Sequence, residues 1–318
     1  MQKHKILTDH IKELTNIEYG KWNSGETDSD DTMVMPSVSY NSAVYRFLFD
    51  FELFIAKKTD IIHHNYEDVL KQAKIKNNIQ DFYNTDINIL SSDVILAMII
   101  GILRKDRFCE GILLEAFDNG IILKWLKRIK EIDKKEEITD KIDKAIKSIW
   151  KKDIPADYEN GWLLKEDTLK NTFYFHLRKR LGKFFAENNI RIFTEFSDGI
   201  FYDTKCRPDM VIAKVNLEAE EDCLCNCITD YLAVIEFKFK NGYIASNDIY
   251  KDYAKLRKYA NRFKINSKLY MATIWEYEDN ETCWESEKNK WAKGKLTELN
   301  ASYTPGTYDM HFYIKEHK

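Results

Sequence analysis

The chain has 318 residues, of which 44% are hydrophobic and 14% aromatic, which is enough to fill the cores of two domains of ordinary size. Its formal net charge of −3 provides no global field that would attract nucleic acid, so any such binding must depend on local clusters or on a bound metal. Composition alone therefore does not predict a nuclease, and the 11 Gly and 4 Pro argue against long flexible linkers.

The opening residues contain no apolar core followed by a cleavage site, so we expect no signal peptide and a cytoplasmic location. The longest apolar run, residues 94–103, falls well short of the ~20 residues that cross a bilayer, and a buried helix explains it better than a membrane span. The six cysteines are then expected to be reduced thiols rather than disulfides.

The first half of the chain is predicted to be mainly helical. The polar run 25–31 is typical of an exposed loop, and apolar residues then recur at helical spacing in residues 41–54 and 67–75. Ser91, Ser92 and Asp93 offer N-cap side chains for a helix over 94–103, and Gly111 and Gly120 separate two shorter helical segments that end near Ile132.

Isoleucines at 138, 142, 146 and 149 predict one amphipathic helix over residues 134–152. We therefore divide the chain into a helical domain of unknown function at 1–133, a helical connector at 134–160 and a second domain at 161–318.

The second domain changes pattern. A long helix is predicted over 166–187, strands over 190–195, 208–215 and 231–240, a helix over 248–263 and a strand over 268–277. This order of one helix, three strands, one helix and one strand is typical of an α/β sandwich, in which helices flank a central mixed sheet.

Charged residues interrupt the predicted sheet at one place. Asp209 follows Pro208 at the start of one strand, while Glu236 and Lys238 end an apolar run in the next strand. Side chains alternate along a strand, so Glu236 and Lys238 share one face while Phe237 faces the other. An apolar central strand rarely ends in such charges without a reason, so these residues mark a candidate site.

This pattern resembles the PD-(D/E)XK superfamily of restriction endonuclease-like nucleases, over residues 161 to 280. The resemblance implies a restriction endonuclease-like fold for residues 161–318 and a metal-dependent hydrolysis of phosphodiester bonds in nucleic acid. A DNA endonuclease is the expected activity, with the N-terminal domain serving targeting or regulation. Many restriction-like enzymes dimerise to cut both strands, so the resemblance also allows a homodimer.

The expected cofactor is Mg²⁺ or Mn²⁺. Asp209 and Glu236 are the predicted ligands, with the backbone carbonyl of Phe237 as a third oxygen, because hard divalent cations prefer oxygen ligands. Lys238 would orient the attacking water or offset negative charge. Glu166, at the start of the apolar stripe of the long helix, is the predicted fourth catalytic residue and metal ligand, and Glu195 is the competing candidate.

Four basic residues are predicted to contact substrate phosphates: Lys240, Arg178, Lys179 and Lys255. Residues 161–318 contain 25 Lys and Arg against 24 Asp and Glu, so a solvated charged surface explains the basic residues on the two helices equally well.

Several alternatives stay open. The domain could be a catalytically inactive nuclease-fold binding module in a defence or repair assembly, or an RNase or toxin with the same site and another substrate. Cys206, Cys223, Cys225 and Cys227 could hold zinc or an iron–sulfur cluster, although the alternating spacing of the last three favours a loop with free thiols.

The first half resembles an uncharacterised bacterial helical domain family, chiefly in the run from Arg104 to Gly111. No activity can be transferred from that family. The charges of Arg104, Asp106, Arg107 and Glu110 are expected to satisfy one another as ion pairs, with a recognition surface for DNA or a partner as the alternative.

Overall fold

The computed structural model describes residues 3–23, 36–57, 62–197, 201, 206–219, 221–240, 247–261, 267–278, 284–286, 289–307 and 309–317, with the backbone alone at 62–64, 247, 248 and 278. The predicted loop at 25–31 and the end of the predicted helix 248–263 lie outside these residues. In the described part of the chain, no helix combines the length and the apolar character that crossing a membrane would require.

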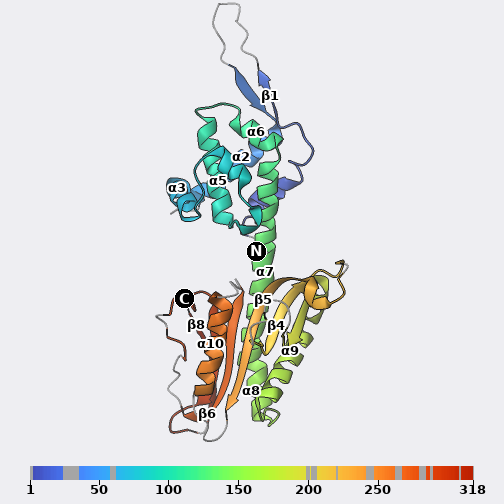
Figure 1. The fold of residues 1–318 in the computed structure, drawn as a ribbon, viewed down its shortest axis with the longest axis vertical. Helices are drawn as coiled ribbons and strands as arrows, with labels where there is room; N and C mark the ends of the chain where they lie inside the picture. The colour runs from blue at the N-terminus through green and yellow to red at the C-terminus, as the bar shows by residue number, and fades with distance from the viewer. Residues whose placement is uncertain are drawn as a thin grey trace, which may run out of the picture. The chain divides into compact units, whose positions relative to one another are not determined.

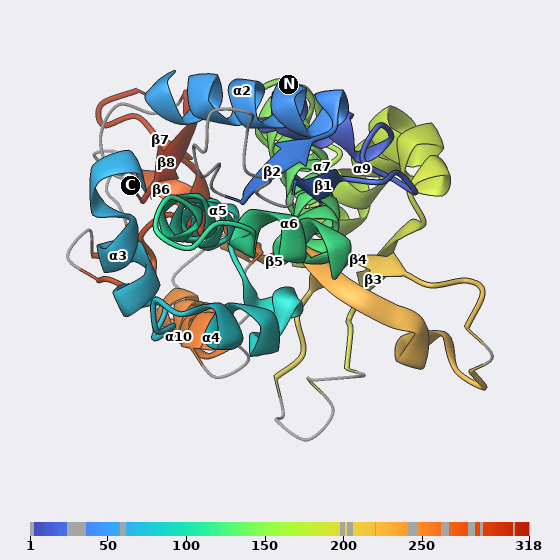
Figure 2. The same cartoon turned by 90° about the horizontal axis from the view of Figure 1, so that it is seen from above.

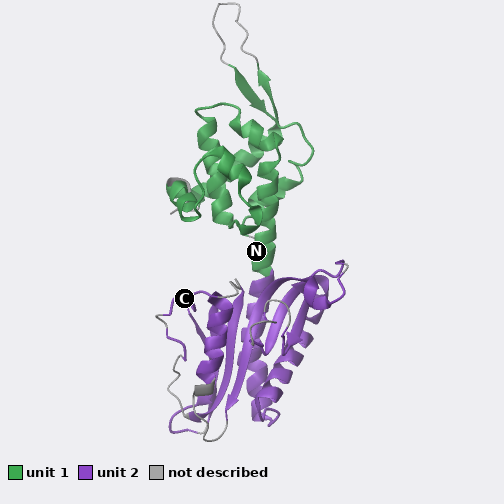
Figure 3. Cartoon of the chain, viewed as in Figure 1, with its two compact units in different colours: residues 1–137 green, residues 138–318 purple. Residues whose placement is uncertain are grey.

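Two compact units make up the chain, residues 1–137 and 138–318 (Figure 3). The division falls within helix α7 (Ile121–Ser148), which continues through a π-helical turn (Ile149–Asp153) into α8 (Ile154–Glu159). Pro155 explains the irregular turn, because proline has no backbone N–H for a regular helical bond.

Residues 138–160, predicted as part of a connector, pack in the second unit. Ile142 and Trp150 belong to its buried core, and the Trp150 indole N–H donates to the Asn300 carbonyl at 3.1 Å. The hydroxyl of Tyr270 donates to Asp143 at 2.7 Å. The isoleucine stripe that predicts an amphipathic helix is therefore the stripe that packs on the sheet.

The first unit consists of helices around one apolar core. The apolar run of the sequence forms the buried part of α5, and Ser91 caps this helix by accepting from the N–H of Val94 at 3.3 Å. In Figure 2 α2 lies across the view while α5 is seen almost end-on. The elements of this unit are α1 (Lys5–Thr8), β1 (Gly20–Asn23), β2 (Ser37–Tyr40), α2 (Ser42–Lys57), α3 (Ile62–Gln72), α4 (Ile79–Asn84), α5 (Ser92–Asp106), α6 (Ile112–Asp118) and the first part of α7, with 3-10 turns at Asp9–Ile11 and Ile87–Ile89.

The second unit contains a six-stranded mixed sheet in the order β3-β4-β5-β6-β7-β8 (Figure 1). The pairs β3–β4, β4–β5 and β7–β8 are antiparallel, while β5–β6 and β6–β7 are parallel. Its remaining elements are α9 (Glu166–Glu187), β3 (Ile190–Thr194), β4 (Met210–Val215), a 3-10 turn (Leu224–Cys227), β5 (Ile228–Lys240), α10 (Asn247–Asn261), β6 (Lys268–Glu278), β7 (Leu296–Tyr303) and β8 (Met310–Glu316).

Helices cover both faces of this sheet. One apolar core joins Phe173 of α9 to Phe237 of β5, and another joins Leu256 of α10 to Val234 and Met271. An α/β domain with a helix-flanked mixed sheet, following a helical half, is therefore confirmed. Along β5, odd-numbered Phe237 faces the α9 side, so Glu236 and Lys238 face the α10 side, as the alternation predicts.

Candidate active site

The predicted site lies where β5 extends beyond β4. The pairing of these strands ends at Met210 and Ile235, whereas β5 stays paired with β6 as far as Lys240. Asp209 immediately precedes β4, at this same end of the sheet. From Glu236 onward, the backbone groups of β5 on the β4 side are therefore not paired with β4. They can instead form hydrogen bonds with side chains such as that of Asp209.

Asp209 bridges the two strands. Its Oδ2 accepts a hydrogen bond from the backbone N–H of Phe237 at 2.7 Å, and its own carbonyl accepts from the N–H of Glu195 at 2.9 Å. Burial raises the pKa of the Asp209 carboxyl, and the negative charge of Glu166 raises it further, against the opposing hydrogen bond from Phe237. The carboxylate is thus fixed in position but short of compensating positive charge.

Glu236 is fully buried beneath α10. The hydroxyl of Tyr259 donates to its Oε1 at 2.8 Å, and the ammonium of Lys255 lies 3.4 Å from its Oε2. Burial raises the pKa of Glu236 well above the ordinary carboxyl value, and the nearby charges of Asp209 and Asp252 raise it further, while Lys255 acts in the opposite direction. Asp209 and Glu236 therefore form a pair of mutually repelling carboxyl groups, of which Glu236 is buried and Asp209 is partly buried.

Lys238 joins the two helices to the sheet. Its ammonium lies 3.0 Å from Oε2 of Glu166, at the first residue of α9, and 2.9 Å from Oδ2 of Asp252 on α10. Lys255 also pairs with Asp252, at 2.7 Å. Burial opposes the charge on Lys238, but its hydrogen bonds with Asp252 and Glu166 outweigh burial and raise its pKa. At neutral pH Lys238 is therefore a charged donor and not a base.

The two acidic candidates for the fourth position have different partners. Glu166 contacts Lys238, whereas Glu195 pairs with Lys170 and, at 3.1 Å, with Arg207. Glu195 also has a backbone φ of 51°, in the left-handed region that few residues other than glycine adopt. Its side chain therefore serves the turn between β3 and the segment leading to β4.

The four predicted phosphate contacts do not lie together. Lys255 contacts Glu236, and Lys240 is buried on the face of β5 that it shares with Lys238. Arg178 and Lys179 are exposed on α9, 12 and 13 residues beyond Glu166, which corresponds to ~18 Å along a helix axis. Any phosphate that reaches them is remote from the carboxylates.

Three contributors were missed by sequence reasoning. Asp252 and Tyr259 lie on α10 at spacings that place them with Lys255 on one helical face, and Lys170 is buried near Asp209, whose pKa its charge lowers. A polar residue on the sheet-packing stripe of an amphipathic helix is the signal that could have revealed Asp252.

The cysteines fall into two places. Cys206 is buried in the apolar core beside α10, while Cys223, Cys225 and Cys227 lie in and beside the 3-10 turn before β5. Within this turn the thiol of Cys227 contacts the carbonyl of Cys223, and the thiol of Cys225 contacts Asn226.

In the first unit, the expected pairing among four charges is wrong for both acids. Oδ1 of Asp106 accepts from the N–H groups of Gly111 (3.1 Å) and Leu113 (2.9 Å), and Oε1 of Glu110 accepts from the N–H of Val38 at 2.7 Å. Backbone donors are closer to these carboxylates than the neighbouring arginines, so the acids build the turn before α6 and hold β2.

The donor chemistry of the candidate site suits a hard cation in part. A divalent cation would stabilise the buried Glu236 and the partly buried Asp209 against their mutual repulsion, and Mg²⁺ commonly uses one or two carboxylates plus water. No group of three or more His, Cys, Asp and Glu side chains in the described part of the chain is arranged to hold a metal ion. A cation would therefore have to rely on Asp209 and Glu236, with water and backbone oxygen for the rest.

Comparison with known proteins bears on the first half alone. No curated protein and no solved structure matches the chain. Residues 2–135 match the model of a family of unknown function, DUF6508, which agrees with the predicted resemblance to a family without assigned activity.

Proposed function

We propose that the second unit is a metal-dependent nuclease of the PD-(D/E)XK superfamily. The observation that carries this proposal is the pairing of Asp209 and Glu236 at the end of two adjacent strands, both with raised pKa values, beside the charged Lys238. Structural carboxylates are normally neutralised by their surroundings, so a buried and a partly buried carboxylate that repel each other favour a functional role.

The chain topology supports the same superfamily. The order α9-β3-β4-β5-α10-β6, with β3 to β6 adjacent in the sheet, is the arrangement that a restriction endonuclease-like core would have. The acidic residue at the start of α9 faces the lysine of β5, which ties the first helix to the proposed site.

Asp209 and Glu236 would hold Mg²⁺ or Mn²⁺, and the Phe237 carbonyl would supply a further oxygen. The N–H and C=O of a residue in a strand point to the same side, and the N–H of Phe237 points to Asp209, at the edge that β4 leaves free. A bound divalent cation would stabilise charge on a phosphate and lower the pKa of an attacking water.

The protein's own residues have distinct tasks in this proposal. Lys238, kept charged by Asp252 and Glu166, would donate to a water or a phosphate oxygen. Tyr259 and Lys255 orient Glu236 and reduce its protonation. Glu166 acts chiefly by positioning Lys238 and is a metal ligand only if that contact is given up.

DNA is the proposed substrate, with the first unit serving targeting or regulation. An RNase or toxin would use the same residues, and an inactive nuclease-fold module in a larger assembly would bind nucleic acid without turnover. Since Asp209, Glu236 and Lys238 are all present, and Lys238 follows Glu236 by two residues on the same face of β5, the active forms are favoured over the inactive one.

The test is cleavage of end-labelled single-stranded DNA, duplex DNA and RNA by the full chain, with Mg²⁺ or Mn²⁺ and with EDTA. The wild type should cut at least one DNA in a metal-dependent manner, Asp209→Asn should not, and the control Asp222→Asn, at an exposed acid of the same unit, should cut normally. Cleavage of RNA alone would support the RNase alternative, and equal cleavage by Asp209→Asn would refute the site.

A further inference from the structure

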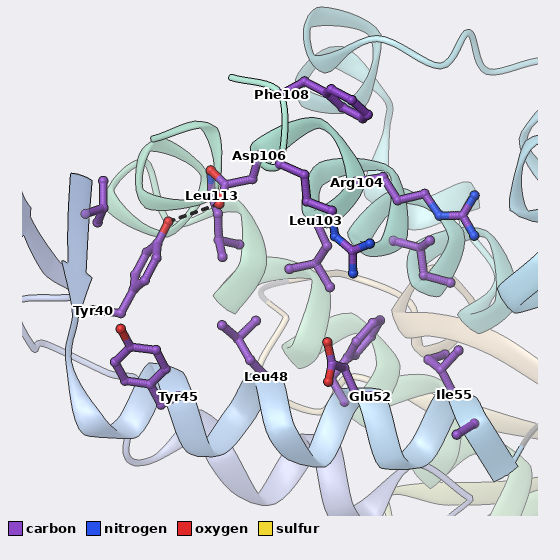
Figure 4. Close-up of a pocket in the computed structure, with 15 residues that line it drawn as sticks. Tyr40, Tyr45, Leu48, Glu52, Ile55, Leu103, Arg104, Asp106, Phe108 and Leu113 are labelled. Carbon is purple, nitrogen blue, oxygen red and sulfur yellow. Dashed lines mark hydrogen bonds between the residues drawn. The ribbon is translucent and has the colours of Figure 1, made fainter. Parts of the chain in front are cut away.

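A groove in the first unit runs along α2. Its volume is ~920 Å³; Leu48, Glu52 and Ile55 of α2 form one side, and Leu103 and Arg104 from the end of α5 form the other (Figure 4). Arg107, the residue after α5, also lines the groove. Its lining along α2 extends from Tyr45 to Ala56, a stretch of twelve residues and ~16 Å, which is about three helical turns. An elongated trough of this length fits the side chains of a helix better than a compact small molecule.

The two sides of the groove carry opposite charges. Glu52 and Arg107 are both exposed, and neither side chain has a hydrogen bond or ion pair with another residue in the described ranges. The acids that could have neutralised Arg107 are occupied, since Asp106 and Glu110 bind backbone N–H groups. The groove thus offers a cation on one side and an anion on the other.

Helix α2 also presents an apolar stripe beside the groove. Tyr45, Phe49 and Leu53 are 55%, 63% and 40% exposed and lie four residues apart, so they follow one another along a single helical face for about two turns. The opposite face of α2 is buried in the core through Phe47, Phe51 and neighbouring residues. A helix that is apolar on both faces is expected to be covered on both.

Nucleic acid is a poor occupant for this groove. Residues 1–137 contain 19 Lys and Arg against 23 Asp and Glu, so the unit as a whole repels phosphates. A partner helix with an apolar stripe and charges of both signs suits the apolar lining of the groove and the opposite charges on its two sides.

We propose that the occupant is α2 of a second copy of this chain. Its exposed apolar stripe would fill about two of the three helical turns of the groove, and each copy carries both the stripe and the groove, so a two-fold symmetric pair satisfies both surfaces at once. Glu52 of each copy then faces Arg107 of the other. The proposal is independent of the nuclease chemistry of the second unit.

The first test is the sedimentation of the full chain over a range of concentrations. The wild type should be a dimer, and Phe49→Glu should weaken dimerisation ~100-fold or more because it places a charge in an apolar contact. Ile89→Glu is the matched control, since Ile89 is 77% exposed on another element of the same unit and should leave the dimer intact. A monomeric wild type, or a Phe49→Glu variant that dimerises normally while circular dichroism shows it folded, overturns the proposal.

Charge reversal separates contacts between copies from contacts within one copy. Glu52→Arg and Arg107→Glu should each place like charges together twice in a symmetric dimer and weaken it ~10-fold or more. An equimolar mixture of the two variants should restore wild-type dimerisation, because both cross-copy pairs are then attractive. If the mixture dimerises no better than its components, Glu52 and Arg107 do not meet across copies and the proposed arrangement is wrong.

Discussion

The carboxylate of Asp209 accepts a hydrogen bond from the backbone N–H of Phe237, 2.7 Å away, on the neighbouring strand. This contact occurs just beyond the last paired residues of β4 and β5, and it holds Asp209 next to Glu236. This bond therefore helps to position the Asp209 carboxylate, on which the proposed chemistry depends.

Two substitutions of Asp209 should separate the effect of this hydrogen bond on stability from the effect of the carboxylate charge on cleavage. Asp209→Asn retains an oxygen that can accept from Phe237, so the fold should be kept while cleavage falls ~100-fold or more. Asp209→Ala leaves the N–H without its acceptor and should also cost ~1–3 kcal/mol of stability. Urea unfolding of both variants, combined with cleavage assays, checks this; equal stability of the two would show that the bond contributes little.

Removing the buried charge of Glu236 should stabilise the protein in EDTA. Because folding raises the pKa of Glu236, the group favours the folded state below its unfolded pKa, and this stability is lost as pH rises through the folded pKa. The Glu236→Gln variant has no ionisable group at this position and does not lose this stability. The melting temperature of the variant minus that of the wild type should therefore increase from pH 5 to pH 8. Each kcal/mol corresponds to ~2–4 °C in a unit of this size.

The measurement is a set of thermal melts across that pH range. A difference that shrinks with rising pH would contradict the raised pKa. The control Asp222→Asn removes an exposed charge and should show no pH-dependent difference.

Lys238 should have a structural role that can be compensated and a chemical role that cannot. Lys238→Met removes one of the two lysines that pair with buried Asp252, leaves the pair with Lys255 and should cost ~1–3 kcal/mol. Adding Asp252→Asn removes the excess negative charge and should recover most of that stability, whereas cleavage should stay lost. Recovery of cleavage together with stability would mean that Lys238 serves the fold alone.

The turn before α6 should tolerate no side chain at Gly111. This residue has a φ of 97°, and an added Cβ would clash with the indole ring of Trp22. Gly111→Ala should therefore destabilise the first unit by ~2 kcal/mol or more, because conformational strain and a clash act together. Gly120 has a similar φ of 74° but open space around it, so Gly120→Ala should cost less, ~1 kcal/mol. Equal losses in thermal melts would show that the Trp22 contact relaxes freely.

Elements with strong periodicity were predictable from the sequence. The predicted helix at 166–187 coincides with α9, and the strand carrying Glu236 and Lys238 was placed with the correct face alternation, because its apolar run and its charged end are both unambiguous. The β1–β2 hairpin was missed because each strand has only four residues and 13 residues separate them, so neither a turn motif nor an alternation stands out.

Side-chain partners were harder to predict than elements. That Asp252 and Tyr259 join Lys238 and Glu236 depends on how α10 is rotated against the sheet, which local spacing does not determine. The acids at 106 and 110 were assigned to neighbouring arginines because those are close in sequence, but backbone N–H groups brought near by the fold compete better for them.

Whether Asp209 and Glu236 together bind a divalent cation is tested most directly by titrating the full chain with Mn²⁺ and counting bound ions by electron paramagnetic resonance. The wild type and Asp222→Asn should bind Mn²⁺ equally, and Asp209→Asn and Glu236→Gln should each lose affinity ~10-fold or more. No Mn²⁺ binding by the wild type with or without DNA, or undiminished binding by both site variants, would contradict the proposed active site.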